Sequence, residues 1–193
     1  MRNILNTKKL YDWQEKIDKE LAQKVSAGGC KHCEGVLHHA DYERKPRGVK
    51  DGEEAIKHWD KRASFCCDQE GCRKRHTPPS VRFLGRKVYV GVVVVLVAAM
   101  MHGANARRIS VLHEALGIDK RTLRRWRQWW LEVFVETPFW KANRARFMPV
   151  LKEALMPYCL VDAFGAKHRE GLIKLMEFLS PITTTSAERM VAM

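Results

Sequence analysis

The sequence predicts a mainly α-helical protein that also contains one small β module. Several segments carry apolar residues at three- and four-residue steps, which is the spacing of one face of an α-helix. One region instead holds two cysteine clusters joined by short strand-like stretches, as is typical of a module too small for a full hydrophobic core. With 193 residues, 46% of them hydrophobic, the chain is long enough for one or two small domains.

The positive charge of the chain is concentrated in one stretch. Thirty-five lysine and arginine residues against 22 aspartate and glutamate residues give a net charge of +13, which favours a polyanionic partner. Residues 73–130 contain thirteen basic and two acidic residues, and therefore carry +11 of this total. We expect the partner to dock on this stretch, because its flanks are nearly neutral. Its basic residues are Arg73, Lys74, Arg75, Arg82, Arg86, Lys87, Arg107, Arg108, Lys120, Arg121, Arg124, Arg125 and Arg127.

The first predicted element is a helix over residues 7–27. Its apolar side chains recur at helical spacing with lysine and glutamate between them. We expect this stripe to pack on the chain's own cysteine module or C-terminal part, and pairing with a second copy or a partner protein is the alternative. The stripe consists of Leu10, Trp13, Ile17, Leu21 and Val25.

Two cysteine clusters follow this helix. A glycine-flanked turn carries Cys30 and Cys33, and the second cluster offers Cys67 and Cys72. In a chain without a secretory signal, paired clusters indicate metal binding and not disulfide bonds. Two turns that each supply two thiolates suit the tetrahedral coordination of Zn²⁺. We therefore predict a structural zinc site, in a module resembling a zinc ribbon, with these four cysteines as ligands.

The ligand set of the second cluster has alternatives. Cys66 is an alternative to Cys67, and His76 is an alternative to either cysteine. We expect short strands over residues 36–42 and 63–66 to carry the two turns.

Three helices are predicted after the cysteine module. Residues 86–101 are almost wholly apolar, and the length of this segment favours a buried helix over a strand. A second helix is predicted over residues 106–116. It is followed by Gly117, which suits the positive φ of a tight turn, and by Asp119, which is placed to cap the next helix.

The third predicted helix is strongly two-sided. At 100° per residue, one side gathers Leu123, Trp126, Trp130, Val133 and Phe134. The other side gathers Arg121, Arg124, Arg125 and Gln128, with Arg127 at the edge of the apolar side. Arginine and glutamine on a helix are the residue types that read guanine and adenine edges in a major groove, and an ordinary solvated basic face is the alternative.

The segment Leu112–Trp126 resembles the helix-turn-helix of homeodomain-like bacterial transposases and regulators. With the cysteine pairs upstream, residues 28–135 are similar to the DNA-binding front end of insertion-sequence transposases. The resemblance implies a homeodomain-like three-helix domain and service to a mobile element, as an accessory or a regulator. Only 58 residues follow Val135, without the strand-rich pattern of a transposase catalytic domain, so we do not expect an enzyme.

Together these features predict sequence-specific binding of double-stranded DNA. Base contacts are expected from Arg121, Arg124, Arg125 and Gln128. Phosphate contacts are expected from Arg73, Lys74, Arg75, Arg107, Arg108 and Arg127, and Lys120 is a further expected DNA contact.

Protein partners are also expected, either a transposase or other subunits, or a second copy of the chain. The alternative function is that of a nucleic-acid-binding subunit in a larger RNA-guided or recombination complex, which predicts recognition of shape with little sequence preference.

The predicted organisation has four segments: an N-terminal amphipathic helix (1–27), a zinc-ribbon-like module (28–80), a DNA-binding domain (81–136) and a helical tail (137–193).

In the tail, we expect a break at Pro138, helices over residues 149–156 and 167–179, and a frayed end over 181–193. The apolar run 88–101 is too short to span a membrane, and no signal peptide is evident. We therefore expect a cytoplasmic, nucleoid-associated bacterial protein without a membrane partner.

Overall fold

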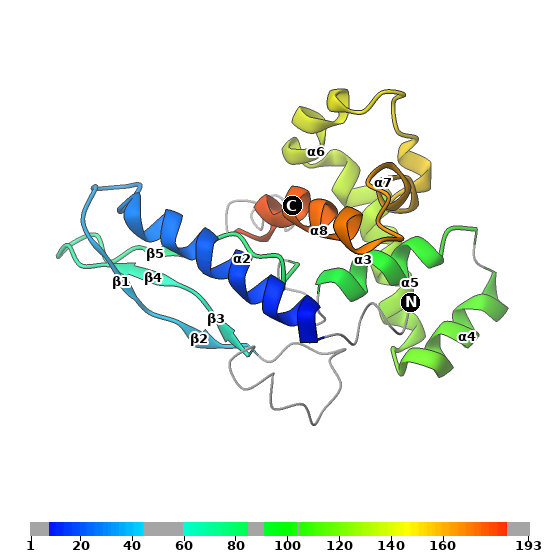
Figure 1. The fold of residues 1–193 in the computed structure, drawn as a ribbon, viewed down its shortest axis with the longest axis horizontal. Coiled ribbons are helices and arrows are strands. Elements are labelled where there is room, and N and C mark those ends of the chain that lie inside the picture. The colour runs from blue at the N-terminus through cyan, green and yellow to red at the C-terminus, as the bar shows by residue number, and fades with distance from the viewer. Residues whose placement is uncertain (1–7, 45–59, 85–90, 104, 185–193) are drawn as a thin grey trace. The chain divides into compact units, whose positions relative to one another are not determined.

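A computed structural model describes residues 8–44, 60–84, 91–103 and 105–184 of the chain. Its described residues are mostly helical with a small amount of antiparallel β-structure, as the sequence predicts (Figure 1). The chain divides into two compact units. Unit 1 comprises residues 1–90 and 179–189, and unit 2 comprises 91–178 and 190–193. The segments 1–27 and 28–80 thus share unit 1.

Unit 1 begins with helix α2 (Lys8–Ala27), close to the predicted bounds. Its most buried side chains are Gln14, Asp18 and Ala22, which recur at four-residue steps. The predicted apolar stripe flanks this face and is only partly buried at Trp13, Ile17, Leu21 and Val25. The two buried polar residues have buried partners in the segment that follows the cysteine module: Asp18 pairs with Arg82, and the Gln14 side-chain amide donates to the Val81 carbonyl at 3.3 Å.

The β-structure of unit 1 is a three-stranded antiparallel sheet and a separate two-stranded pair. In the sheet, β4 lies between β1 and β5, and Phe65 of β4 is opposite both His39 and His76. The single strand predicted over residues 36–42 is divided into two short strands. The sheet strands are β1 (Leu37–His39), β4 (Phe65–Cys67) and β5 (Arg75–His76), and the pair is β2 (Tyr42–Glu43) with β3 (Lys61–Arg62).

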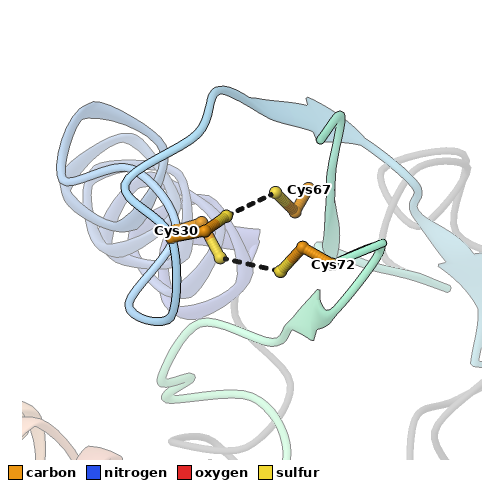
Figure 2. Close-up of side chains that lie close together, drawn as sticks. Cys30, Cys67 and Cys72 are labelled. Atoms are coloured by element: carbon orange, nitrogen blue, oxygen red, sulfur yellow. Dashed lines mark hydrogen bonds between the residues drawn. The ribbon is translucent and has the colours of Figure 1, made fainter. Parts of the chain in front are cut away.

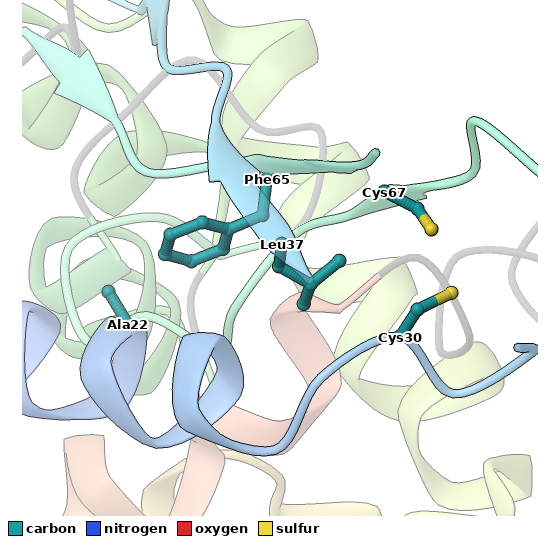
Figure 3. Packing of buried hydrophobic residues seen from close by; sticks show 5 residues of the cluster. All are labelled: Ala22, Cys30, Leu37, Phe65 and Cys67. Carbon is teal, nitrogen blue, oxygen red and sulfur yellow. The ribbon is translucent and has the colours of Figure 1, made fainter. Parts of the chain in front are cut away.

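A small hydrophobic core joins α2 to the sheet. Ala22, Leu37 and Phe65 pack together with Cys30 and Cys67, and all five are buried (Figure 3). The partner of α2 is therefore the chain's own cysteine module, which was the first of the two expectations for this helix. A core of this size contributes little stability on its own.

A second buried cluster in unit 1 is polar. The Arg82 guanidinium donates to the Asp18 carboxylate, with 2.7 Å between Nε and Oδ2. Ser80 and Val81 also donate to this carboxylate, through the hydroxyl group at 2.6 Å and the backbone N–H at 2.7 Å. Because Arg82 is buried and paired, it is not part of the exposed positive charge that the sequence suggested.

Unit 2 is helical. Its first helix, α3, contacts both α5 and α7 and is buried over residues 93–99, as the apolar sequence predicts. The predicted beginning of this helix, at residue 86, lies outside the described residues. No helix in the described ranges is long and apolar enough to cross a membrane. The helices are α3 (Gly91–Met100), α4 (Ala106–Leu116), α5 (Lys120–Gln128), α6 (Pro138–Asn143), α7 (Tyr158–Ala163) and α8 (Arg169–Leu179).

Helix α5 is followed directly by a segment that is helical but not α-helical. A π-helical segment covers Trp129–Val133 and a 3₁₀ turn covers Phe134–Glu136, where one regular α-helix was expected. Trp130 and Phe134 are fully buried, with ring centroids 4.7 Å apart. The aromatic residues thus lie on the buried side, as predicted, although the backbone there is not α-helical.

The tail has the predicted break at Pro138 and differs from the prediction farther along. The 3₁₀ turn before the break ends at Glu136, Thr137 is extended, and Pro138 begins α6, in which the Trp140 N–H donates to the Thr137 hydroxyl at 3.1 Å. The helix predicted over residues 149–156 is wrong, since only Glu153–Leu155 form a 3₁₀ turn there. The backbone is extended at Lys152 and again at Met156, the residue before Pro157, and α7 begins after this proline.

The last described residues rejoin unit 1. Helix α8 ends at Leu179 as predicted, and Ser180–Thr183 form a 3₁₀ turn. Ile182 and Thr183 are buried, and the Thr183 hydroxyl accepts the Ser80 N–H at 2.8 Å. The expectation of a frayed end is therefore wrong for residues 181–183, and residues 185–193 lie outside the described part.

Candidate metal centre and nucleic-acid interface

The first cysteine pair lies in the turn between α2 and β1. Gly29 has φ +67°, a backbone conformation that suits glycine, and it brings the chain into the turn directly after α2. The Cys30 N–H then donates to the Gly35 carbonyl at 2.9 Å, and the Glu34 N–H donates to the Cys30 carbonyl at 2.8 Å. These two hydrogen bonds close a tight loop that turns Cys30 and Cys33 in one direction.

The second pair lies around the turn between β4 and β5. Cys67 is the last residue of β4, and its N–H donates to the Lys74 carbonyl at 3.0 Å. Cys72 lies inside the turn and donates its N–H to the Gln69 carbonyl at 3.1 Å.

The two turns approach each other closely at Gly35. A Cβ atom on this residue would lie 3.2 Å from the Cys67 sulfur and 2.4 Å from Cγ of Gln69. Only a residue without a side chain fits there unless Gln69 moves. The glycine therefore permits the contact that brings the two cysteine pairs together.

The four predicted ligands form one cluster. The sulfur atoms of Cys30, Cys33, Cys67 and Cys72 all lie within 4.8 Å of one another. The Cys33 and Cys67 sulfur atoms are separated by 3.3 Å. The Cys30 and Cys72 sulfur atoms are separated by 3.7 Å (Figure 2). Tetrahedral coordination with metal–sulfur bonds of about 2.3 Å places sulfur atoms about 3.8 Å apart. The cluster therefore has the dimensions of a tetrathiolate metal site.

The structure distinguishes among the alternatives in the second cluster. Cys66 is outside the group, and its sulfur lies 3.4 Å from the Arg73 carbonyl oxygen. His76 lies beside the group, with its Nε2 atom 3.3 Å from the Cys30 sulfur. It is buried in β5, and its position came from the sheet register opposite Phe65, which the sequence did not indicate.

The environment gives two of the cysteines opposite protonation tendencies. For Cys30, burial acts to raise the pKa, but hydrogen bonds from the backbone of His32 and Cys33 and from His76 lower it to about 5. For Cys67, burial raises the pKa to about 12. Cys30 is therefore the more readily available thiolate, and a bound cation has to displace the proton of Cys67.

The basic part of unit 2 is centred on the connection between α4 and α5. Gly117 ends α4 with φ +64° and donates its N–H to the His113 carbonyl at 2.8 Å. Asp119 then caps α5 by accepting the Arg121 N–H at 2.7 Å and the Thr122 N–H at 3.3 Å. Three residues thus connect α4 to α5, with the positive φ at Gly117 and the cap at Asp119 that the sequence predicts.

Helix α5 separates its basic and apolar residues. Leu123 and Trp126 are buried, whereas the arginines of the helix and Gln128 are exposed. In the described part of the chain, no carboxylate pairs with the guanidinium groups of this helix. Their side-chain contacts are weak or local, such as Arg125 to Thr122 at 3.4 Å. The exposed arginines are Arg121, Arg124, Arg125 and Arg127.

The remaining predicted DNA contacts are distributed over both units. Arg107 and Arg108 are exposed in the first turn of α4, and Lys120 is partly buried at the beginning of α5. The three basic residues after Cys72 are exposed in unit 1, namely Arg73, Lys74 and Arg75. Arg86 and Lys87 of the basic stretch lie outside the described residues.

Comparisons with protein-family models, with curated proteins and with solved structures found no match.

Proposed function

We propose that this protein binds double-stranded DNA with a sequence preference, and that α5 lies in the major groove. The observation that carries the proposal is the row of exposed arginines on α5, opposite its buried Leu123 and Trp126. Among the described residues, no carboxylate pairs with the guanidinium groups of these arginines. Arginine donates two hydrogen bonds to a guanine edge, and glutamine pairs in the same way with adenine. In this proposal Arg121, Arg124, Arg125 and Gln128 make the base contacts of a helix-turn-helix.

The flanking cations hold phosphates. Arg107 and Arg108 lie in the first turn of α4, where the helix dipole favours anions and disfavours cations. A DNA phosphate at this position offsets the unfavourable interaction between the two arginines and the helix dipole. It also accepts hydrogen bonds from backbone N–H groups at the helix N-terminus. Arg127 and Lys120 supply further backbone contacts, which set the register of α5 on the duplex.

The metal of the cysteine cluster is proposed to be Zn²⁺. Four thiolates in tetrahedral reach of one ion are the ligand set of a closed, structural zinc site, since no position is left open for a reacting water. The ion cross-links the two turns and so stabilises a module with a small apolar core. Arg73 directly follows the ligand Cys72, so the zinc site also fixes the position of Arg73, Lys74 and Arg75 for contact with phosphates.

The biological setting is proposed from the resemblance of residues 28–135 to the front end of insertion-sequence transposases. A chain with this combination serves a mobile element as an accessory that recognises its ends, or as a regulator.

The test is selection of duplexes from a random-sequence pool by the purified full-length protein loaded with zinc. We expect one short motif to be enriched, and the Arg124→Ala/Arg125→Ala double variant to lose its preference for that motif. The charge-matched control is Lys167→Ala/Lys174→Ala, which removes two exposed cations from unit 2 outside α5.

Three outcomes contradict the proposal. Enrichment without any motif indicates that the arginines contact phosphates only. Preference for a structured RNA over every duplex supports the alternative of a subunit in a larger nucleoprotein complex. Equal losses in the α5 variant and in the control show that total charge, and not α5, determines binding.

A further inference from the structure

Unit 2 displays an apolar tip between α6 and α7. Met148 and Val150 are 87% and 70% exposed, and Pro149 between them is exposed as well. Single exposed apolar residues are common, but three in succession on a connection are not explained by folding of the chain.

The tip is held at both ends. On one side, the Phe147 ring packs against Trp140, Phe164 and Phe178, with centroid separations of 5.7 to 5.8 Å. On the other side, the Glu153 carboxylate accepts the Trp140 indole N–H at 2.7 Å. The residues on both sides of the tip, Phe147 and Glu153, are therefore anchored on the aromatic core. The tip between them remains exposed.

The residues that hold the tip also contact the segment that continues α5, the helix proposed to enter the major groove. The turn Glu153–Leu155 contacts the π-helical segment Trp129–Val133, which directly continues α5. The position of the tip is thereby fixed relative to α5 within unit 2.

The residues around the tip are cationic. Between Thr137 and Glu153 there are four basic residues and no acidic residue. Arg144 is exposed although it pairs with Glu153 at 3.3 Å, and Arg146 is exposed although it donates to Asn143 at 3.0 Å. Lys152 is exposed on the other side of the tip. The tip therefore suits a partner that has an anionic surface and an apolar interior.

We propose that Met148, Pro149 and Val150 form a wedge that enters between base pairs of the bound duplex, with Arg144, Arg146 and Lys152 on the adjacent phosphates. This inference rests on the proposed function. Stacked bases offer an apolar interior behind an anionic backbone, and methionine and proline are side chains that unstack base steps and kink DNA. Insertion of the wedge would bend the DNA, which base contacts from α5 alone do not do.

The experiment uses the zinc-loaded full-length protein and the duplex recovered by selection, labelled at both ends for energy transfer. A 2-aminopurine series across the duplex locates any unstacked step. We expect the wild type to bend the duplex and to raise 2-aminopurine fluorescence at one step. The Met148→Ser/Val150→Ser variant is expected to lose both signals and to bind about tenfold more weakly. The control is Val36→Ser, a similarly exposed valine (60%) in unit 1.

The outcomes separate this inference from the proposed function. If the wild type binds the duplex and the tip variant bends it equally, the wedge is overturned and the function stands. If the wild type does not bind the duplex, the wedge and the proposed function both fail. Tip-dependent binding to phosphatidylserine vesicles, without any unstacking of DNA, overturns the wedge and assigns the tip to a membrane surface. Thermal unfolding of the variant is expected to match the wild type, since the substituted side chains are exposed.

Discussion

Asp18 and Arg82 form an ion pair inside unit 1, with 2.7 Å between Oδ2 and Nε and side chains that are only 2% and 6% exposed. The pair joins α2 to the segment that follows the cysteine module. Its charges are removed from water and satisfied by each other and by hydrogen bonds from Ser80 and Val81. Buried pairs of this kind are costly to break on one side only, because the remaining charge is left without a partner.

We therefore expect Asp18→Ala to lower the free energy of unfolding by about 3–5 kcal/mol. Urea unfolding followed by circular dichroism measures the change. The control is Glu15→Ala on the same helix, which removes the pair between the partly buried Glu15 and the exposed Lys19 and is expected to cost at most about 1 kcal/mol. A loss in Asp18→Ala no larger than in the control contradicts a stabilising role for the buried pair.

Adjacent cysteines provide a matched test of the metal site. Cys67→Ser is expected to abolish stoichiometric zinc binding, because it removes one of the four clustered sulfurs. Cys66→Ser is expected to keep it, since the Cys66 sulfur faces the Arg73 carbonyl. Metal analysis of the purified variants and the absorption of their Co²⁺ forms measure both. Equal zinc contents in the two variants would show that the cluster is not the metal site.

His76 is expected to support the metal site from outside the ligand set. Its Nε2 atom lies 3.3 Å from the Cys30 sulfur, and an N–H group at this position stabilises the thiolate. We expect His76→Phe to weaken zinc binding about 10- to 100-fold in competition with a chelator. His38→Ala, which changes an exposed histidine of the same sheet, is the control. A Co²⁺ spectrum with nitrogen ligation in the wild type would instead make His76 a ligand.

Gly171 in α8 has no room for a side chain unless the neighbouring backbone moves. A Cβ atom there would lie 2.2 Å from the Phe164 carbonyl oxygen and 2.3 Å from that of Gly165, and both are backbone atoms. We expect Gly171→Ala to destabilise unit 2 by about 1–3 kcal/mol, although alanine favours helices. Thermal unfolding measures the loss, and an unchanged midpoint would indicate that α7 and α8 move apart at little cost.

The sequence predicts those parts of the structure that depend on local chemistry. The bounds of α2, the turn from Gly117 to Asp119, and the two faces of α5 all follow from neighbouring residues. The cysteine cluster is predicted from the spacing of the cysteines, because two short turns that each carry two cysteines are typical of a metal site.

The features that sequence reasoning missed depend on distant partners. Asp18 and Arg82 are 64 residues apart in the sequence. Each is a charged residue of a type that usually lies on the surface, so neither position indicates burial. Strand β5 has only two residues and no pattern of its own, so its pairing with β4 was not predicted, although the sequence offered His76 as an alternative ligand. The π-helical segment Trp129–Val133 keeps the aromatic residues buried, so hydrophobic spacing does not distinguish it from an α-helix.

The hydrogen bond from the Ser80 N–H to the Thr183 hydroxyl has a consequence for biosynthesis. It joins residues 103 positions apart, and residues 91–178 of unit 2 lie between them in the chain. A ribosome therefore delivers residues 91–178 before it delivers the segment that contains Thr183. Residues 91–178 are thus available to fold first, whereas unit 1 is completed only after Ser180–Thr183 have been synthesised.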